Sequence, residues 1–411
     1  MGVTAPASGV KRTSAPVRGG TWLLVTLGAL SAFGPLCMDM YLPALPQLAT
    51  SLSSTAGAAQ LSLSACIIGL GVGQLVVGPF SDRFGRKNPL LIGLSLFVLA
   101  SALCAVSTSM TLLIALRLLQ GAAGAAGIVL CRAIVADRFT GKAAAAYFST
   151  IAAINGLAPI LAPVFGAQVL RVGTWRTVFW VLTGIGVVLV ALTLMFVRES
   201  LPEERRSASG VSGTLQAFRG LLTDRVYLGY AVAGSSVCAA MFGYISASPF
   251  LLQEGFGLTP QVFSLCFAVN AFGIVAMSQL SRFLLRRTDS VALMRWGVWQ
   301  CAVGAGLLAG ILLSGAGLLL VLGSLFVMVS SVGFALPHAS VLAMDLHRMI
   351  AGSASALLGA FQYAFGAITA WLVGFGDKSA GSALAYTAVG AALVAVLGLW
   401  MSAGAKRAVA L

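Results

Sequence analysis

Long apolar stretches alternate with short polar segments along almost the whole chain. Twelve of these stretches are long enough, at about 20 residues, to carry a helix across the ~30 Å hydrocarbon core of a bilayer. They lie near residues 21–48, 57–80, 88–107, 110–132, 143–170, 175–197, 226–251, 260–284, 290–314, 317–344, 352–375 and 380–404. A membrane β-barrel would instead show alternating segments of about ten residues. The pattern therefore predicts an all-α membrane protein with twelve transmembrane helices.

One longer polar segment divides the twelve stretches into six and six. In addition, GQLVVGPFSDRFGRK at 73–87 aligns with GIVAMSQLSRFLLRR at 273–287, sharing a Gly, a Ser and two basic positions. Internal repeats of this kind are typical of transporters. We therefore predict two pseudo-symmetric six-helix bundles with a linker and two tails. The predicted boundaries are a tail at 1–20, bundles at 21–197 and 226–404, a linker at 198–225 and a tail at 405–411.

The charges of the chain are few and lie mostly on one side of the predicted spans. Charged residues make up 9% of the chain, against about 25% in a soluble domain. The net charge of +14 would suit nucleic-acid binding, but the positions of the charges argue against it. All but four of the 25 Lys and Arg residues fall on one side, the four being Arg171, Arg176, Lys378 and, within a span, Arg117. The positive-inside rule makes the basic side cytoplasmic, with both termini inside.

Five motifs are distributed over the two halves. They are MDMYLPALPQL at 38–48, GPFSDRFGRK at 78–87, RLLQGAAGAAG at 117–127, LAPILAPVFGA at 157–167 and AGSASALLGAFQ at 351–362. The second, third and fourth resemble the signature loop, the fourth-helix motif and the fifth-helix antiporter motif of the major facilitator superfamily. The first and last are more similar to its bicyclomycin/chloramphenicol-resistance group of drug:proton antiporters. The chain departs from these patterns at Ala162 and Ala167, where glycine is usual, and at His338, where asparagine is more common.

The resemblance implies proton-coupled efflux of chloramphenicol- or bicyclomycin-like drugs by alternating access. It implies a location in the bacterial cytoplasmic (inner) membrane, contact with lipid and no cofactor, and we expect a monomer. It also assigns conformational gating to a cytoplasmic loop, to the acid that follows the fourth span and to one face of the fifth helix. These residues are Gly78, Asp82, Arg83, Gly85, Arg86, Asp137, Gly156, Pro159, Pro163 and Gly166.

Asp39 lies inside an apolar run, in the stretch LCMDMYLPALP at 36–46. Intramembrane acids are costly and usually face a bundle interior or a wet cavity, where burial favours the protonated form. We therefore predict that Asp39 carries protons; the alternative is an acid at the outer interface. Arg117 needs a partner or a hydrated cavity. We expect it to pair with Asp39, directly or through water; the alternative is a fixed structural counter-charge.

Five polar or aromatic residues within spans are candidates for binding substrate: Tyr41, Asn155, His338, Gln362 and Tyr363. For Tyr41, anchoring at the membrane interface explains the sequence equally well. For His338, the alternative is a neutral, hydrogen-bonded packing residue.

Other classes of function find little support in the sequence. The chain contains no GxxxxGK[ST] phosphate loop, the ATP-binding motif that ATP-driven transport would need. His338 and His347 are too few for haem pairs or dinuclear metal sites, and the seven cysteines show no metal or disulfide spacing. We therefore expect no enzyme activity and no metal. The remaining alternative is an exporter or facilitator of an endogenous metabolite, such as a sugar or amino acid.

Overall fold

The computed structural model describes residues 20–206, 218–345, 347, 350–374 and 380–409. Within this part the secondary structure is helical and supplies twelve helices long and apolar enough to cross a membrane, which confirms the predicted all-α architecture. The elements are α1 (Gly20–Ser31), α2 (Phe33–Asp39), η1 (Leu42–Ala44), α3 (Leu45–Ser51), α4 (Ala56–Phe84), α5 (Lys87–Val106), α6 (Met110–Arg138), α7 (Gly141–Val172), α8 (Trp175–Phe196), η2 (Glu203–Arg205), α10 (Arg225–Pro249), η3 (Phe250–Gly255), α11 (Pro260–Leu284), α12 (Ser290–Leu313), α13 (Leu318–Ser330), α14 (Val332–Asp345), α15 (Ala351–Gly374) and α16 (Ala380–Val409).

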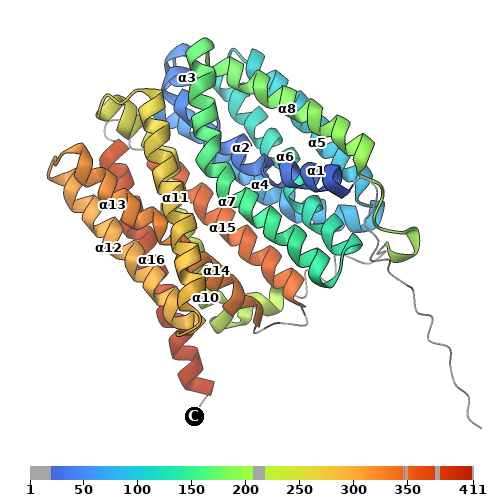
Figure 1. The fold of residues 1–411 in the computed structure, drawn as a ribbon. Coiled ribbons are helices and arrows are strands. Elements are labelled where there is room, and N and C mark those ends of the chain that lie inside the picture. The colour runs from blue at the N-terminus through green and yellow to red at the C-terminus, as the bar shows by residue number, and fades with distance from the viewer. Residues whose placement is uncertain (1–19, 207–217, 346, 348–349, 375–379, 410–411) are drawn as a thin grey trace, which may run out of the picture.

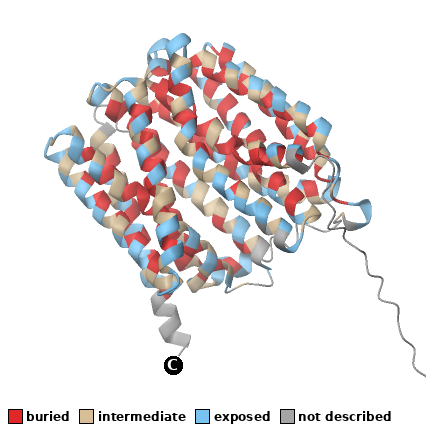
Figure 2. Cartoon of the chain, in the orientation of Figure 1, coloured by how far each residue is buried: buried red, intermediate tan, exposed pale blue. Residues whose placement is uncertain are grey.

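The outward faces of the helices are as apolar as the inward ones. On α5, Ile92, Leu96, Leu99 and Leu103 form one exposed stripe, each at least 40% exposed. Figure 2 shows exposed residues along the outer faces of the helices and buried ones where helices meet. A helix that is hydrophobic on every side requires an apolar surrounding, so this is a multi-pass membrane protein.

Two helical bundles lie side by side in Figure 1, α1–α8 in blue to green and α10–α16 in yellow to red. Glycines allow close helix packing in each half. A Cβ on Gly121 of α6 would lie 2.2 Å from the carbonyl oxygen of Cys66 on α4, and one on Gly398 of α16 would lie 2.9 Å from that of Gly229 on α10. Small residues at such crossings let backbones approach, which strengthens packing between helices in lipid.

The first span of each bundle is interrupted at a proline. In the first bundle, Pro43 and Pro46 follow α2, and the span continues as η1 and α3. In the second, α10 reaches Pro249 and continues as the π-helical turn η3. Proline removes a backbone hydrogen bond from the helix ladder. The two halves are therefore interrupted at corresponding positions, which supports their pseudo-symmetry.

We call the end of the bundles where α8 ends and α10 begins the linker end, and the opposite end the far end. Residues 1–19, which make up nearly all of the predicted N-terminal tail, lie outside the described residues, as do 207–217 of the predicted linker. At the other terminus, α16 runs to Val409, beyond the boundary predicted at 404, and 410–411 also lie outside the described part.

Candidate functional site

A cavity of about 780 Å³ lies between the two bundles. We call it the central cavity. α4 and α6 of the first bundle and α14 and α15 of the second form its walls. Four residues selected from the sequence line it: Gly78, Asp82, Gln362 and Tyr363. Its volume falls within the ~300–1,000 Å³ typical of small-molecule sites.

The central cavity has several polar lining residues that sequence reasoning did not select: Gln74, Arg132, Ser340, Ser353 and Ser355. Arg132 was assigned to the basic flank of the fourth span, which was expected to end there. Because α6 continues to Arg138, Arg132 lies two turns inside the helix and on the cavity wall. The signal that could have found it is its spacing of four residues from Ile128, which places both side chains on one helical face.

The predicted gating residues of the loop between α4 and α5 come together around Arg86. Its guanidinium donates to Asp82 at 2.5 Å, to Asp137 at 2.9 Å and to the Ser81 hydroxyl at 2.7 Å. Burial alone would lower the pKa of Arg86, but its bonds to Asp137 and Asp82 raise the pKa above its usual range. Arg83 instead lies over the Phe84 ring, 5.3 Å from its centre. The Arg86 cluster therefore belongs wholly to the first bundle.

Glu199, which the sequence did not single out, ties the linker to this loop. Its carboxylate accepts hydrogen bonds from the amides of Arg86 and Lys87, at the start of α5, and of Ser200 and Leu201. Burial raises the pKa of Glu199, but the hydrogen bonds from the four amides lower it by more. The pKa of Glu199 therefore lies below its usual value. Gly85 makes this possible, because its φ is +89° and a Cβ there would lie 2.5 Å from Glu199 Oε2.

Arg117 is fully buried within the first bundle. Its Nη1 donates to the Cys37 carbonyl at 3.1 Å and to Gln120 Oε1 at 2.5 Å. The guanidinium carbon also lies 4.2 Å from the centre of the Tyr41 ring, a cation–π contact. Nε and Nη2 of Arg117 are buried without a hydrogen-bond partner.

Asp39 is 5% exposed, and its Oδ1 is buried without a hydrogen-bond partner. The span continues for the residues Met40–Ser51 beyond it, so Asp39 lies inside the span rather than at its outer end. Among the ion pairs that the described residues make within 4.0 Å, none joins Asp39 to Arg117, so the direct form of the expected pair is absent. The span turns after Asp39 into η1, which packs against α7 and against α11 of the second bundle.

Three of the five substrate candidates do not line the central cavity. Tyr41 is buried beneath Arg117, with its hydroxyl 3.1 Å from Ser62 Oγ. His338 is buried, and its Nε2 lies 2.6 Å from Ser281 Oγ of α11, because an enclosed imidazole needs a polar partner. Asn155 lies half-buried on α7.

The fifth-helix segment lies at the junction of the two bundles, as the resemblance implied. Ser264 Oγ of α11 donates to the Pro163 carbonyl at 3.0 Å, and Gln261 Nε2 to the Ala167 carbonyl at 3.1 Å. A Cβ on Gly166 would lie 1.8 Å from the Met40 carbonyl oxygen. The two hydrogen bonds join the bundles at the far end, whereas the close approach of Gly166 to Met40 lies within the first bundle.

Toward the linker end, the same α7–α11 seam is looser. Gly156 faces Val275 of α11, whose methyl carbon would lie 3.4 Å from an added Cβ. Pro159 is half-buried on α7.

The cysteines carry no disulfide in the described structure, and Cys37 and Cys66 lie closest, with their sulfur atoms 3.5 Å apart. No group of three His, Cys, Asp or Glu side chains within the described residues could hold a metal ion.

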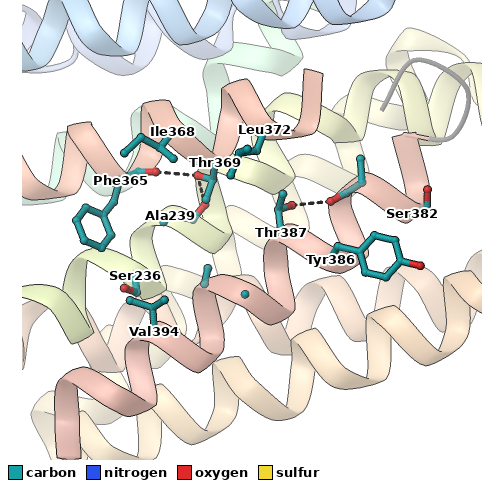
Figure 3. A pocket seen from close by; sticks show the side chains of 13 residues that line it. Ser236, Ala239, Phe365, Ile368, Thr369, Leu372, Ser382, Tyr386, Thr387 and Val394 are labelled. Carbon is teal, nitrogen blue, oxygen red and sulfur yellow. Dashed lines mark hydrogen bonds between the residues drawn. The ribbon is translucent and has the colours of Figure 1, made fainter. Parts of the chain in front are cut away.

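A second cavity of about 630 Å³ lies within the second bundle, between α10, α15 and α16. Figure 3 shows Thr369 on its wall, donating to the Ala239 carbonyl at 2.9 Å. Tyr386 is 66% exposed and Ile368 53% exposed, so this space opens on the outer face of the helices. It is apolar and lies within one bundle, whereas the central cavity is bounded by both. The central cavity is therefore the candidate site.

Two six-helix bundles around a shared cavity define a membrane transporter. The family model of the Major Facilitator Superfamily matches residues 27–370, and the chain belongs to this family. An uncharacterized MFS-type transporter of Bacillus subtilis, YdgK, is 39% identical over 364 residues, which cover 87% of this chain and 90% of that protein. A bicyclomycin resistance protein homolog of Haemophilus influenzae is 28% identical over 380 residues, covering 91% and 94%.

The fold also matches solved structures at low identity. The crystal structure of a bacterial homolog of the human lysosomal transporter Spinster, inward-facing and unoccupied, has a TM-score of 0.74 at 15% identity. The match covers 96% of this chain and 98% of that one, which shows the shared fold.

Proposed function

We propose that this protein exports a small molecule from the cell in exchange for protons, by alternating access. The observation that carries the proposal is the central cavity, which both bundles line and which the α7–α11 contacts close at the far end. The positive-inside rule assigns the linker end to the cytoplasm, because Arg171 and Arg176 are the only described basic residues near the far end. The cavity then receives substrate from inside the cell, across the inner membrane.

Asp39 is our proposed proton carrier. A buried carboxylate without a cationic partner is costly, and binding a proton removes that cost. The short helix η1 that follows Asp39 packs against both α7 and α11, so the protonation of Asp39 would act near the junction of the two bundles. Arg117 is our proposed counter-charge, and its two nitrogen atoms without partners could donate hydrogen bonds to a rearranged Asp39 or to a water molecule.

The Arg86 cluster is our proposed latch for the opposite conformation. Asp82 and Ser353, near the start of α15, line the same cavity from opposite bundles. When the linker end closes, Asp82 would approach the N-terminus of α15, whose positive helix dipole attracts a carboxylate. Gly156, Pro159, Pro163 and Gly166 would form the seam along which the bundles rock.

The proposed substrate is a drug of the chloramphenicol or bicyclomycin type, which the Haemophilus influenzae relative's name supports. The polar lining of the cavity, with Gln74, Arg132, Gln362 and Tyr363, also supports a second candidate, a polar endogenous metabolite.

Resistance profiling tests the proposal. An efflux-deficient host that produces the protein should grow at higher concentrations of chloramphenicol or bicyclomycin, and a proton uncoupler should abolish the gain. Resistance that survives the uncoupler would show that protons do not drive export. No resistance to either drug, with proton-driven uptake of a metabolite into inside-out vesicles, would favour the second candidate.

A further inference from the structure

Arg132 differs from three other described arginines of the first bundle, Arg86, Arg117 and Arg138, in the partners of its guanidinium. Arg117 is enclosed among hydrogen-bond acceptors, Arg86 binds two carboxylates, and Arg138 donates to the Arg198 carbonyl at 2.6 Å. Arg132 is exposed and lines the central cavity, and within the described residues no carboxylate lies within 4.0 Å of its guanidinium.

The two charged residues that line the central cavity differ in their partners. Asp82 and Arg132 are the two charged residues among the described lining, and Asp82 is already bound by Arg86 at 2.5 Å. Tyr363, on the wall that the second bundle contributes, lines the same cavity as Arg132. Ser353 and Ser355, in the first turn or two of α15, line the same space, and the positive end of that helix dipole adds to the field of Arg132.

The walls beside Arg132 are apolar. Ile128 and Val129 lie on the same face of α6, and Leu75 faces them from α4. A ligand that fits both features has an apolar body and one anionic group. The planar guanidinium matches a carboxylate or phosphate with two parallel hydrogen bonds, which a neutral group cannot reproduce.

We propose that Arg132 binds the anionic group of an amphipathic organic anion in the central cavity, and that it selects such molecules over neutral analogues. This inference rests on the proposed function, because it takes the central cavity as the place where substrate binds.

The test compares two fluorescent probes that differ only in charge, dansylglycine and its neutral amide, dansylglycinamide. Each is titrated against the purified full-length protein in phosphatidylcholine nanodiscs, and the dansyl emission reports binding. We expect the carboxylate to bind at least about tenfold more tightly than the amide, since hydrogen bonds to charged groups are the stronger class. In Arg132→Gln the two dissociation constants should become equal within about twofold. Arg132→Lys should keep part of the preference, because the charge remains without the planar fork.

Arg282→Gln is the matched control. Arg282 is exposed at the same end of the bundles and does not line the cavity, so the variant loses the same charge and should keep the wild-type preference. Equal affinities in the wild type, an unchanged preference in Arg132→Gln, or no binding of either probe at about 1 mM would each overturn the inference.

Uptake of a neutral drug into inside-out vesicles separates this inference from the proposed function. Proton-driven uptake without any preference for the carboxylate probe would remove the role of Arg132 and leave proton-coupled export standing. A clear preference for the carboxylate without proton-driven uptake of any tested compound would keep the binding site and remove the coupling.

Discussion

The guanidinium of Arg117 lies 4.2 Å from the centre of the Tyr41 ring and donates to the carbonyl of Cys37, all inside the first bundle. Arg117 therefore stabilises the interrupted first span without binding Asp39, which is buried nearby with an unpartnered oxygen atom. A buried charge held by a ring and carbonyl groups leaves the acid available for another partner. The predictions below follow from this separation and from the contacts at the two ends of the bundles.

Asp39→Asn should abolish proton-driven transport while the protein still folds and binds substrate. The amide keeps the shape of the side chain but cannot exchange a proton at physiological pH. The measurement is uphill uptake into inside-out vesicles under an imposed pH gradient. Glu254→Gln is the control, since Glu254 is an exposed acid at the end of the corresponding span of the second bundle. Uphill uptake that persists in Asp39→Asn would remove this residue from coupling.

Arg117→Ala should slow turnover and lower the free energy of unfolding by about 3 kcal/mol, because the buried Cys37 carbonyl and Gln120 lose their donor and a fully buried side chain leaves a cavity. Thermal unfolding and transport rates of the purified protein measure the two effects. Arg176→Ala provides the comparison, because Arg176 makes a similar ring contact with Trp175, at 4.3 Å, near the surface. We expect at most about 1 kcal/mol there. Wild-type kinetics in Arg117→Ala would show that this side chain has no part in the transport cycle.

Gly166→Ala should disturb the packing of α7 on the first span at the far end. The added Cβ would lie 1.8 Å from the Met40 carbonyl oxygen, so α7 must move away from the first span. Labelling of a cysteine introduced at the far end should therefore become faster, and transport should fall. Gly184→Ala on α8 is the control, because a Cβ there meets no atom within 4 Å and alanine favours the helix. Equal labelling in the two variants would contradict the seam proposed here.

Asp82→Asn should shift the protein toward the conformation described here, in which Asp82 lines an open cavity. If Asp82 latches the opposite conformation, its loss destabilises that conformation alone and leaves substrate binding intact. Labelling of Ser355→Cys, a reporter on the cavity wall, should become faster. The labelling is done in a protein that also carries Cys266→Ser, because Cys266 is the one native cysteine that is not buried. Asp289→Asn, at the corresponding loop of the second bundle, should leave labelling unchanged.

Glu199→Gln should reduce stability in a pH-dependent way. The pKa of Glu199 is lowered in the folded protein, so its contribution is present above the pKa of the unfolded chain and is lost as pH falls through the folded value. The difference in Tm between wild type and variant should be constant near neutral pH and should shrink below about pH 4, the ordinary range of Glu. A difference that grows on acidification would contradict the amide contacts as its cause.

The spans could be predicted from the sequence because hydropathy alone decides which segments leave water. The association of Asp82, Arg86 and Asp137 could also be anticipated, because opposite charges at adjacent helix ends have few other partners. The partners of the individual residues in the first span could not be predicted from the sequence. Cys37 and Asp39 are two residues apart on α2, so they point to different sides of the helix. The side of Cys37 faces Arg117, whereas none of the ion pairs among the described residues joins Asp39 to Arg117.

Arg132 and Glu199 show why the rest of the site required coordinates. From the sequence, a basic residue near the end of a hydrophobic run is assigned to the cytoplasmic edge of the membrane. That assignment changes only when the helix is known to continue, as α6 does to Arg138. Glu199 binds backbone amides of a loop more than a hundred residues earlier in the chain, and amides carry no sequence signature.

α15 borders both cavities, with Gln362 and Tyr363 on the central one and Phe365, Ile368 and Thr369 on the outward one. A rigid displacement of this single helix must reshape both spaces together. Whatever occupies the outward space is therefore mechanically linked to the central cavity. If the central cavity holds substrate as proposed, lipid chains that enter the outward space would alter its shape, and transport would depend on the composition of the membrane.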